Sequence, residues 1–148
     1  MTELPAGEHI EADTKIATLL LISGIACLGI GTVAVVSPAT IASQIGYAFT
    51  TPGGRGEFMT FYGGFYIGIG LFLLLAARYQ QFRSGAFAFL ALSATTAIPV
   101  RLYGFLQLGA SEPVFYQLLF GELLFATAGW IGLYLLNQTD KRKLVSGD

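Results

Sequence analysis

Hydrophobic residues gather in four long segments along this 148-residue chain, and short polar stretches separate them. Each segment holds about 20 to 23 residues, so an α-helix rising about 1.5 Å per residue reaches about 30 Å, the thickness of a bilayer's hydrocarbon core. The segments are apolar on all sides, whereas the outer helices of a soluble bundle need a polar face. The pattern predicts an all-α protein, a transmembrane four-helix bundle in one domain over residues 1–148, with spans at 16–36, 58–77, 86–108 and 114–136 and polar tails at 1–15 and 137–148.

The link between the first two spans is the longest and has a pattern of its own. The stretch "SPATIASQIGYAF" opens with a Ser-Pro pair, which is typical of a helix start. At helical spacing, Ile41, Ile45 and either Ala48 or Phe49 fall on one face. We therefore expect a short interfacial or re-entrant helix between spans one and two.

The remaining links set the order of the spans. "TTPGGRGE" predicts a Pro-Gly-Gly turn that leads into the second span and brings Arg55 and Glu57 to its outer mouth. "RYQQFRSG" is a polar link between spans two and three, on the opposite side of the membrane. "GASEP" is so tight that spans three and four should form a helical hairpin.

Composition places the chain in a membrane and excludes several kinds of site. Hydrophobic residues make up 54% of the chain and charged residues 11%, which is too apolar for a water-soluble globule of this size. The net charge of -1 offers no basic surface to a nucleic acid. Cys27 is the only cysteine and His9 the only histidine, so one chain cannot form a dithiol relay, paired-histidine haem ligation or a histidine-rich metal site. We expect no cofactor and no metal, and membrane lipids as partners.

Lysine and arginine residues outside the spans are distributed unevenly. With the N-terminus inside, the outer side of the membrane holds only Arg55. Because cytoplasmic loops are enriched in these residues, we expect a multi-pass membrane protein with both termini in the cytoplasm. The residues on the inner side are then Lys15, Arg78, Arg83, Lys141, Arg142 and Lys143.

Two charged residues lie inside the apolar segments. An isolated guanidinium in hydrocarbon costs about 2.5 to 3.5 kcal/mol, so Arg101 needs a partner or a water-filled cavity. Glu122 lies at a similar depth on the other arm of the predicted hairpin, roughly 10 Å below the outer surface. We therefore expect these two residues to form an ion pair, with Glu57 as a second partner for an arginine that reaches outward.

Small residues share the helical faces of these charges, and they mark where membrane helices approach closely. We expect the charges to face the interior of the bundle. The glycine-rich stretch "GGFYIGIG" in span two lacks the preceding strand of a nucleotide-binding loop. Its residues Gly63, Gly64 and Gly68 are therefore expected to serve helix packing.

Pro99 lies inside the third span, where it removes a backbone donor and predicts a kink. We expect the freed carbonyl of Thr95 to be satisfied by the hydroxyl of Thr95 or Thr96, or by water. A kink at this point can open a cavity beside the charges.

Polar residues at a similar depth suggest an outward-facing pocket near the ion pair. For Tyr103 and Tyr116, which lie near span ends, a role as membrane-interface anchors is favoured. The residues expected around the pocket are Tyr62, Tyr66, Tyr103, Gln107, Tyr116 and Gln117, with Arg55 and Glu57 at its mouth.

Three motifs carry a family resemblance: "GEFMTFYGGFYIGIG" in span two, "IPVRLYG" in span three and "GELL" in span four. Over roughly residues 16–136 the chain resembles an uncharacterised bacterial family of small four-span membrane proteins, known as a domain of unknown function (number 4345). The resemblance supports the fold, implies a location in the bacterial inner membrane and implies no activity. The residues that match its polar and glycine positions are Glu57, Gly63, Gly64, Arg101 and Glu122.

Several functions remain open at this point. The first is binding of a small anionic or lipid-like ligand, held by Arg101 and tuned by Glu57 and Glu122. The second is that of an accessory subunit of a larger membrane complex, which docks through the glycine-rich spans one and two and in which the ion pair only fixes helix packing. A homo-oligomer that carries lipid or ligand would instead agree with binding. Transport and lipid modification are weaker alternatives. No nucleophile or cofactor motif accompanies the carboxylates, so we expect no catalytic residues.

Overall fold

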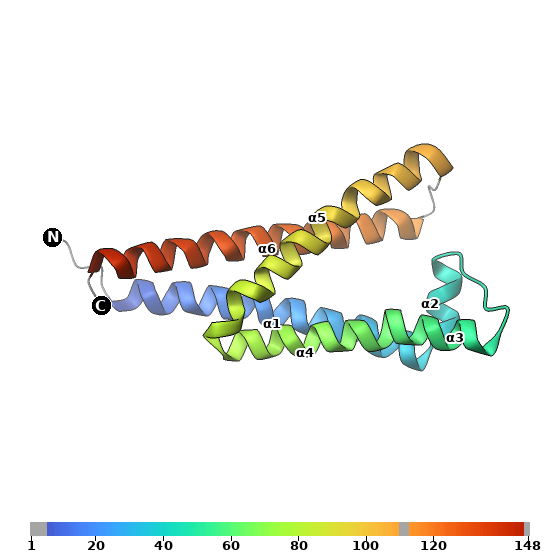
Figure 1. Ribbon diagram of the computed structural model, residues 1–148, viewed down its shortest axis with the longest axis horizontal. Coiled ribbons are helices and arrows are strands. Elements are labelled where there is room, and N and C mark those ends of the chain that lie inside the picture. The colour runs from blue at the N-terminus through green and yellow to red at the C-terminus, as the bar shows by residue number, and fades with distance from the viewer. Residues whose placement is uncertain (1–5, 110–112, 147–148) are drawn as a thin grey trace.

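The computed structural model describes residues 6–109 and 113–146, which are largely helical (Figure 1). Four helical segments are long and apolar enough to cross a membrane, so the predicted all-α, four-span fold is confirmed: Asp13–Val36, Pro52–Arg78, Gln80–Gln107 and Pro113–Gln138. The elements are α1 (Ala6–Val36), α2 (Pro38–Gln44), α3 (Pro52–Phe58), the π-helix η1 (Met59–Phe65), α4 (Tyr66–Arg78), the 3-10 helix η2 (Gln80–Phe82), α5 (Arg83–Leu108) and α6 (Pro113–Ser146).

The short helix predicted between the first two spans is α2. Pro38 occupies its first turn, where a helix needs no backbone donor. Ile41, Ile45 and Phe49 turn toward a small core and pack against buried Phe58. Apolar contact on one face thus holds α2 and the following loop against the second span.

The second span begins earlier than predicted because its entry is a helix. The hydroxyl of Thr51 accepts a hydrogen bond from the backbone N–H of Gly54 at 3.1 Å, and Pro52 follows at the first helical position. The predicted Pro-Gly-Gly turn is therefore wrong. From Pro52 onward α3, η1 and α4 run without a break, and η1 is a stretch of π-helix, a feature found frequently at functional sites.

Glycines bring α1 against η1 and α4. A Cβ atom on Gly31 would lie 2.8 Å from the carbonyl oxygen of Gly63, and one on Gly70 would lie 2.8 Å from that of Gly24. Backbones that approach this closely gain the van der Waals contact on which helix association in lipid depends. The first two spans therefore form one tight helix pair.

Gly64 and Gly68 do not serve this packing, contrary to the expectation. A Cβ atom on either residue would meet nothing within 4 Å. They line an apolar groove of about 420 Å³ on the outer surface of the span, together with Phe65, Phe72 and others. The reason is their position: neighbouring Gly63 faces α1, so Gly64 and Gly68 face away from it.

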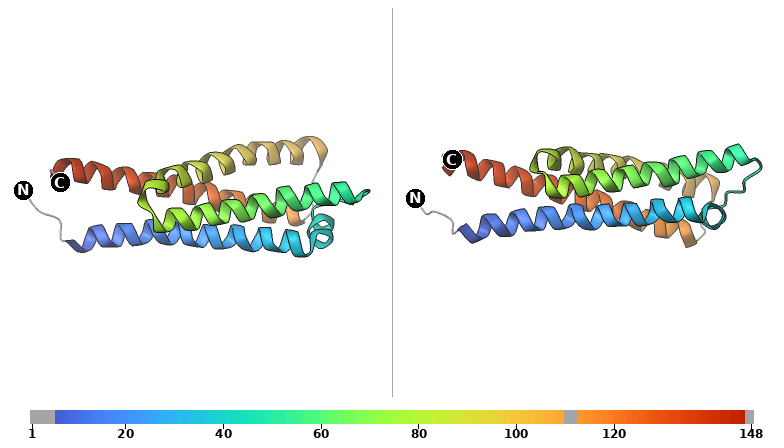
Figure 2. Two further views of the ribbon diagram at one scale, coloured as in Figure 1. Left: turned by 60° about the horizontal axis from the view of Figure 1, so that its bottom comes forward. Right: turned by 90° about the horizontal axis from the view of Figure 1, so that it is seen from below.

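The helices α5 and α6 form the second pair. A Cβ atom on Gly129 would lie 2.3 Å from the backbone nitrogen of Ala91, and one on Gly132 would lie 2.2 Å from the ring of Phe87. Both glycines are buried. The absence of side chains at these two positions lets α5 cross α6 closely (Figures 1 and 2).

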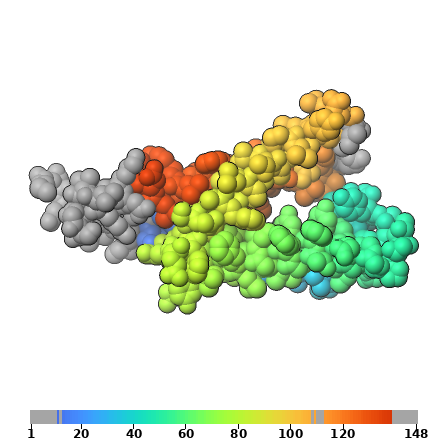
Figure 3. Space-filling view, viewed as in Figure 1, coloured from blue at the N-terminus to red at the C-terminus, as the bar shows by residue number. Residues whose placement is uncertain are grey.

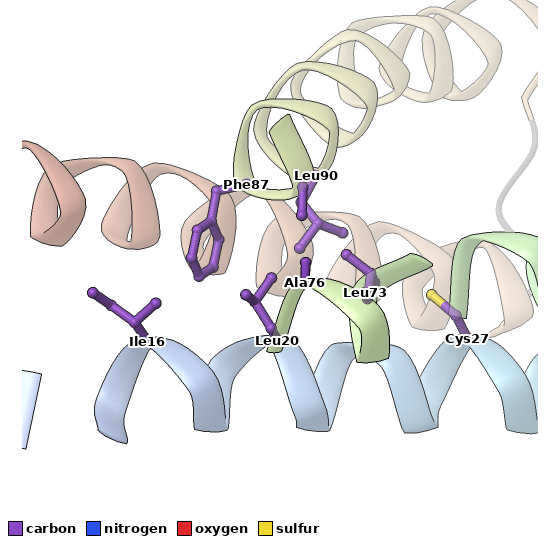
Figure 4. Close-up of a cluster of buried hydrophobic side chains, with 8 residues drawn as sticks. Ile16, Leu20, Cys27, Leu73, Ala76, Phe87 and Leu90 are labelled. Atoms are coloured by element: carbon purple, nitrogen blue, oxygen red, sulfur yellow. The ribbon is translucent and has the colours of Figure 1, made fainter. Parts of the chain in front are cut away.

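The two pairs meet at the end of the bundle where α1 begins and α6 ends, which we call the closed end (Figures 1 and 2). Its core contains Ile16 and Leu20 from α1, Leu73 from α4 and Phe87 from α5, all almost fully buried (Figure 4). Helices from both pairs contribute, so this core joins them.

Toward the opposite end, which we call the open end, the two pairs separate. The helix α5 packs on α4 near its beginning and then leans away from it (Figure 1). The space-filling view shows the surface hollowed between the far half of α5 and the segment that contains α2, α3 and η1 (Figure 3). We call this hollow the cleft.

Candidate functional site

Arg101 on α5 and Glu122 on α6 are in direct contact at the open end. The Nε of Arg101 donates a hydrogen bond to Oε2 of Glu122 at 2.8 Å, and its Nη2 donates to Oε1. This is the two-pronged geometry that arginine and carboxylate form best. The guanidinium carbon also lies 5.4 Å from the ring centroid of Phe115. The structure thus brings together the two charges that the sequence placed on one hairpin, and we call them the cleft pair.

The hairpin explains why these two residues meet. Gly109 ends α5 in the left-handed conformation, with φ of 67°, which glycine adopts without strain. Pro113 begins α6. The middle of the predicted "GASEP" link, residues 110–112, lies outside the described residues. Arg101 precedes Gly109 by about as many residues as Glu122 follows Pro113. The two side chains therefore lie at matching depth in the hairpin, as the sequence indicates.

Pro99 does not interrupt α5, which continues through it to Leu108. The predicted rescue of the freed carbonyl by a threonine hydroxyl is wrong. Thr96 donates its hydroxyl to the carbonyls of Leu92 and Ser93 instead, at 2.9 and 3.0 Å. The hydroxyl of Thr95 accepts a hydrogen bond from the indole of Trp130 at 3.1 Å, so it links α5 to α6.

The cleft pair is shielded but not sealed. The side chain of Arg101 is 22% exposed and that of Glu122 is 18% exposed. Tyr62 and Tyr66 on the opposite helix pair lie within electrostatic range of Arg101, and Tyr66 is also within range of Glu122. The charges of the cleft pair are therefore felt by two tyrosines of the other helix pair, without a hydrogen bond between them among the described residues.

These same two tyrosines line a cavity of about 680 Å³ at the open end, which we call the aromatic cavity. Ligand sites in proteins commonly have volumes of this order. Its walls come from the loop after α2 and from one face of α3, η1 and the start of α4. The full lining is Gly46, Tyr47, Ala48, Phe49, Thr50, Gly54, Glu57, Phe58, Phe61, Tyr62, Phe65 and Tyr66.

Tyr47 reaches this cavity because of how α2 ends. Gly46 adopts a φ of 79°, the N–H of Tyr47 donates to the carbonyl of Ala42 at 2.8 Å, and that of Gly46 donates to Ser43 at 3.2 Å. This pair of bonds is the Schellman arrangement that closes a helix and reverses the chain. As a result the ring of Tyr47 meets that of Tyr62 edge-on at 6.3 Å between centroids.

The π-helix brings the other aromatic residues to the cavity. A π turn contains more residues than an α turn, so residues four apart stay closer to one line along the helix. Phe61 and Phe65 are stacked with centroids 6.3 Å apart, and both are largely exposed. Sequence analysis missed them. Their spacing of four was visible in the sequence, but the π geometry that aligns them with Glu57 and the tyrosines was not.

Glu57 lines the aromatic cavity, whereas the two residues of the cleft pair do not. Among the described residues Glu57 makes no ion pair, so the expected contact with Arg101 is absent. Arg55 and Gln117 are exposed and do not line the cavity. The same is true of the other polar residues that were expected around the pocket, which are Tyr103, Gln107 and Tyr116.

A second ion pair, which sequence analysis missed, lies at the closed end. Arg83 at the start of α5 contacts Asp13 on α1 with both terminal nitrogens. It also donates to the carbonyl oxygens of Ala76 and Ala77 at 3.4 and 3.2 Å, and Gln80 donates to Asp13 at 3.3 Å. We call Arg83 and Asp13 the clamp pair. Within the described part of the chain, no group of three or more histidine, cysteine, aspartate or glutamate residues is placed to hold a metal ion.

A family model described as a domain of unknown function (DUF4345) matches residues 16–133 of the chain. The chain belongs to this family. No curated protein and no solved structure matches it. The part of the chain that matches the DUF4345 family includes both residues of the cleft pair and every residue that lines the aromatic cavity. Because the family description names no activity, function must be argued from the site.

Proposed function

We propose that this member of the DUF4345 family binds a lipid-like or small anionic ligand at the open end of the bundle, between the cleft pair and the aromatic cavity. The main support is that Arg101 and Glu122 are partly exposed, and that Tyr62 and Tyr66, which lie within electrostatic range of Arg101, line a cavity of about 680 Å³. Ionisable residues inside a membrane span are costly and commonly mark a functional site. Both side chains of this pair keep some exposure, so neighbouring side chains do not seal it completely.

The chemistry of Arg101 favours the lipid-like ligand over a free anion. Glu122 neutralises the guanidinium, so the pair as a whole attracts a free anion only weakly. Arginine carries five N–H donors. Two of its nitrogens are engaged with Glu122, which leaves donors on Nη1 for an ester or phosphate oxygen. A headgroup attached to acyl chains adds apolar contact in the cleft to these hydrogen bonds.

Charge distribution supports the proposed location, the bacterial inner membrane with both termini in the cytoplasm. Arg78 and Arg83 lie at the closed end, where α1 begins and α6 ends, whereas Arg55 lies on α3 at the other end. This is the asymmetry expected when the closed end faces the cytoplasm. The aromatic cavity then lies near the outer membrane surface.

The alternative of an accessory subunit has less support. Its expected docking face was the glycine-rich surface of the first two spans, but Gly24, Gly31, Gly63 and Gly70 pack against each other's helices within the chain, so only part of that surface, with Gly64 and Gly68, stays exposed. Stoichiometric co-purification of another membrane protein, with no retained lipid, would favour this alternative.

A double substitution separates a ligand site from a packing device. Arg101→Met combined with Glu122→Leu removes both charges and keeps apolar volume, a change that buried ion pairs often tolerate without loss of stability. We expect the variant to fold and to lose most of the lipid that the wild-type protein retains through purification, measured by mass spectrometry of extracted lipids. Arg55→Met is the matched control. A folded double variant with undiminished lipid would contradict the proposal.

A further inference from the structure

We propose that the aromatic cavity binds the ammonium group of a zwitterionic phospholipid, with Glu57 as its counter-ion. This inference rests on the proposed function, since it takes a lipid as the ligand, and it adds the chemical class of the headgroup. It concerns residues other than the cleft pair, so the two ideas can fail separately.

The walls of the cavity are suited to an organic cation. Tyr47 and Tyr62 stand edge to face on one side, with ring planes inclined at 73°. Phe61 and Phe65 line the cavity from successive turns of η1. The face of an aromatic ring carries negative potential, and cages of such rings recognise alkylammonium groups. No lysine or arginine is among the lining residues, so no protein cation competes for the space.

Glu57 gives the cavity a negative charge that the described part of the protein does not neutralise. The other carboxylates whose side chains the structure describes are paired: Glu11 with Lys15, Asp13 with Arg83, and Glu122 with Arg101. Glu57 has no such partner, and it is an exposed residue that lines the cavity together with the aromatic side chains. An anion is repelled here, whereas an alkylammonium group gains both the carboxylate and the ring faces.

The position of the cavity favours a lipid over a soluble cation. Phe61 and Phe65 are 62% and 63% exposed, on a helix that is apolar enough to span a membrane. The rings therefore face the region that acyl chains occupy, close to one end of the span, where headgroups lie. A phospholipid can place its ammonium group beside Glu57 while its chains run along the exposed rings. A free alkylammonium ion lacks this second contact.

The test compares two lipids that differ in headgroup charge but share acyl chains. Native mass spectrometry of the full chain, released from detergent, measures retention of phosphatidylethanolamine against phosphatidylglycerol. We expect the wild-type protein to prefer phosphatidylethanolamine by about threefold to tenfold, the range expected for a cation held by aromatic faces. Glu57→Gln should bring the ratio close to one. Phe61→Leu should lower it by about threefold.

Matched controls are available elsewhere in the chain. Phe120 on α6 is 63% exposed, like Phe65, but does not line the cavity, so Phe120→Leu should leave the ratio unchanged. Glu11→Gln, which removes an exposed carboxylate near the closed end, should also leave it unchanged. Thermal unfolding of each variant shows whether the fold is intact.

The outcomes distinguish this inference from the proposed function. Equal retention of both lipids, unaffected by Glu57→Gln, overturns the ammonium site and leaves lipid binding intact. Loss of both lipids in the double variant of Arg101 and Glu122, with the ratio in Glu57→Gln near one, supports both ideas. Binding of tetramethylammonium without retention of either lipid overturns the choice of a lipid as the source of the ammonium group.

Discussion

The closed end and the open end of the bundle each contain an arginine paired with a carboxylate, yet the two pairs have different surroundings. The side chain of Arg83 is 6% exposed and also donates hydrogen bonds to two backbone carbonyls. Each of the three guanidinium nitrogens therefore has a protein partner. Arg101 has Glu122 as its sole hydrogen-bond partner among the described residues, and its side chain is 22% exposed. An arginine–carboxylate pair thus joins helices at the closed end. At the open end the same kind of pair leaves N–H donors of Arg101 available.

The difference extends to the packing around each pair. At the closed end Phe87, Ile16 and Leu20 fill the space between the helix pairs. At the open end aromatic residues surround a cavity. A fold that is rigid at one end and open at the other can hold a ligand without risking the stability of the whole bundle. Function in such proteins is often located in the less tightly packed part.

The largest effect should come from breaking the clamp pair. Arg83→Ala removes the partner of Asp13 and leaves the carbonyls of Ala76 and Ala77 without their donor, so we expect the free energy of unfolding in detergent to fall by about 3 kcal/mol. Arg78→Ala is the control, because Arg78 is exposed and forms no ion pair among the described residues, its guanidinium lying 5.4 Å from the centroid of the Tyr79 ring. Equal losses in the two variants would mean that the clamp pair contributes no more than a surface charge.

Substitutions of two glycines on α6 test whether the closed end is packed more tightly than the open end, and we expect the next largest effect from them. Gly132→Ala places a Cβ atom 2.2 Å from the ring of Phe87, so we expect a loss of about 2 kcal/mol from overpacking. Gly121→Ala, near Glu122 at the open end, meets nothing within 4 Å. It should gain about 0.5 kcal/mol from the better helix propensity of alanine. Thermal unfolding of both variants decides this, and a larger loss at Gly121 would contradict the assignment of the ends.

A smaller energy is expected for the cleft pair. Arg101→Ala should lower stability because Glu122 loses its partner, and adding Glu122→Gln should recover part of the loss. We expect a coupling of about 1 kcal/mol from the double-mutant cycle, modest because both side chains retain some exposure. Strictly additive losses would show that the two residues are not coupled.

The smallest effect belongs to the exposed pair of Glu11 and Lys15, whose charged atoms lie 2.7 Å apart. The hydrogen bond from Lys15 lowers the pKa of the Glu11 carboxyl below its usual range. A lowered pKa in the folded state favours folding at neutral pH, and this contribution disappears as the pH falls through the lowered pKa. We expect Lys15→Gln to restore the pKa, measured by carbon NMR titration of Glu11, with no detectable change in thermal stability. A clear loss of stability would show that exposure alone does not separate weak pairs from strong ones.

Local sequence patterns predicted the spans and the cleft pair because both depend on short-range rules. Four apolar segments of membrane length predict four helices. A short link between the last two spans then brings Arg101 and Glu122 to one depth. These conclusions need only residue counts along one hairpin.

The clamp pair and the aromatic cavity depend on contacts that no local pattern reveals. Asp13 and Arg83 are 70 residues apart, and each taken alone resembled a residue at the end of a span. Tyr47 reaches the cavity through a helix cap, and Phe61 and Phe65 reach it through a π-helix. The expectation for Gly64 and Gly68 failed for a similar reason, because a glycine pattern does not say which of two adjacent residues faces the partner helix.

The most direct test of the open end is a crystal structure of the protein grown in a lipidic mesophase that contains phosphatidylethanolamine. We predict density for one lipid in the cleft, with its phosphate or ester oxygens beside Nη1 of Arg101 and its ammonium group between Glu57 and the rings of the aromatic cavity. A structure in which α5 closes onto η1, seals Arg101 and Glu122 behind side chains and leaves no lipid density would contradict the account.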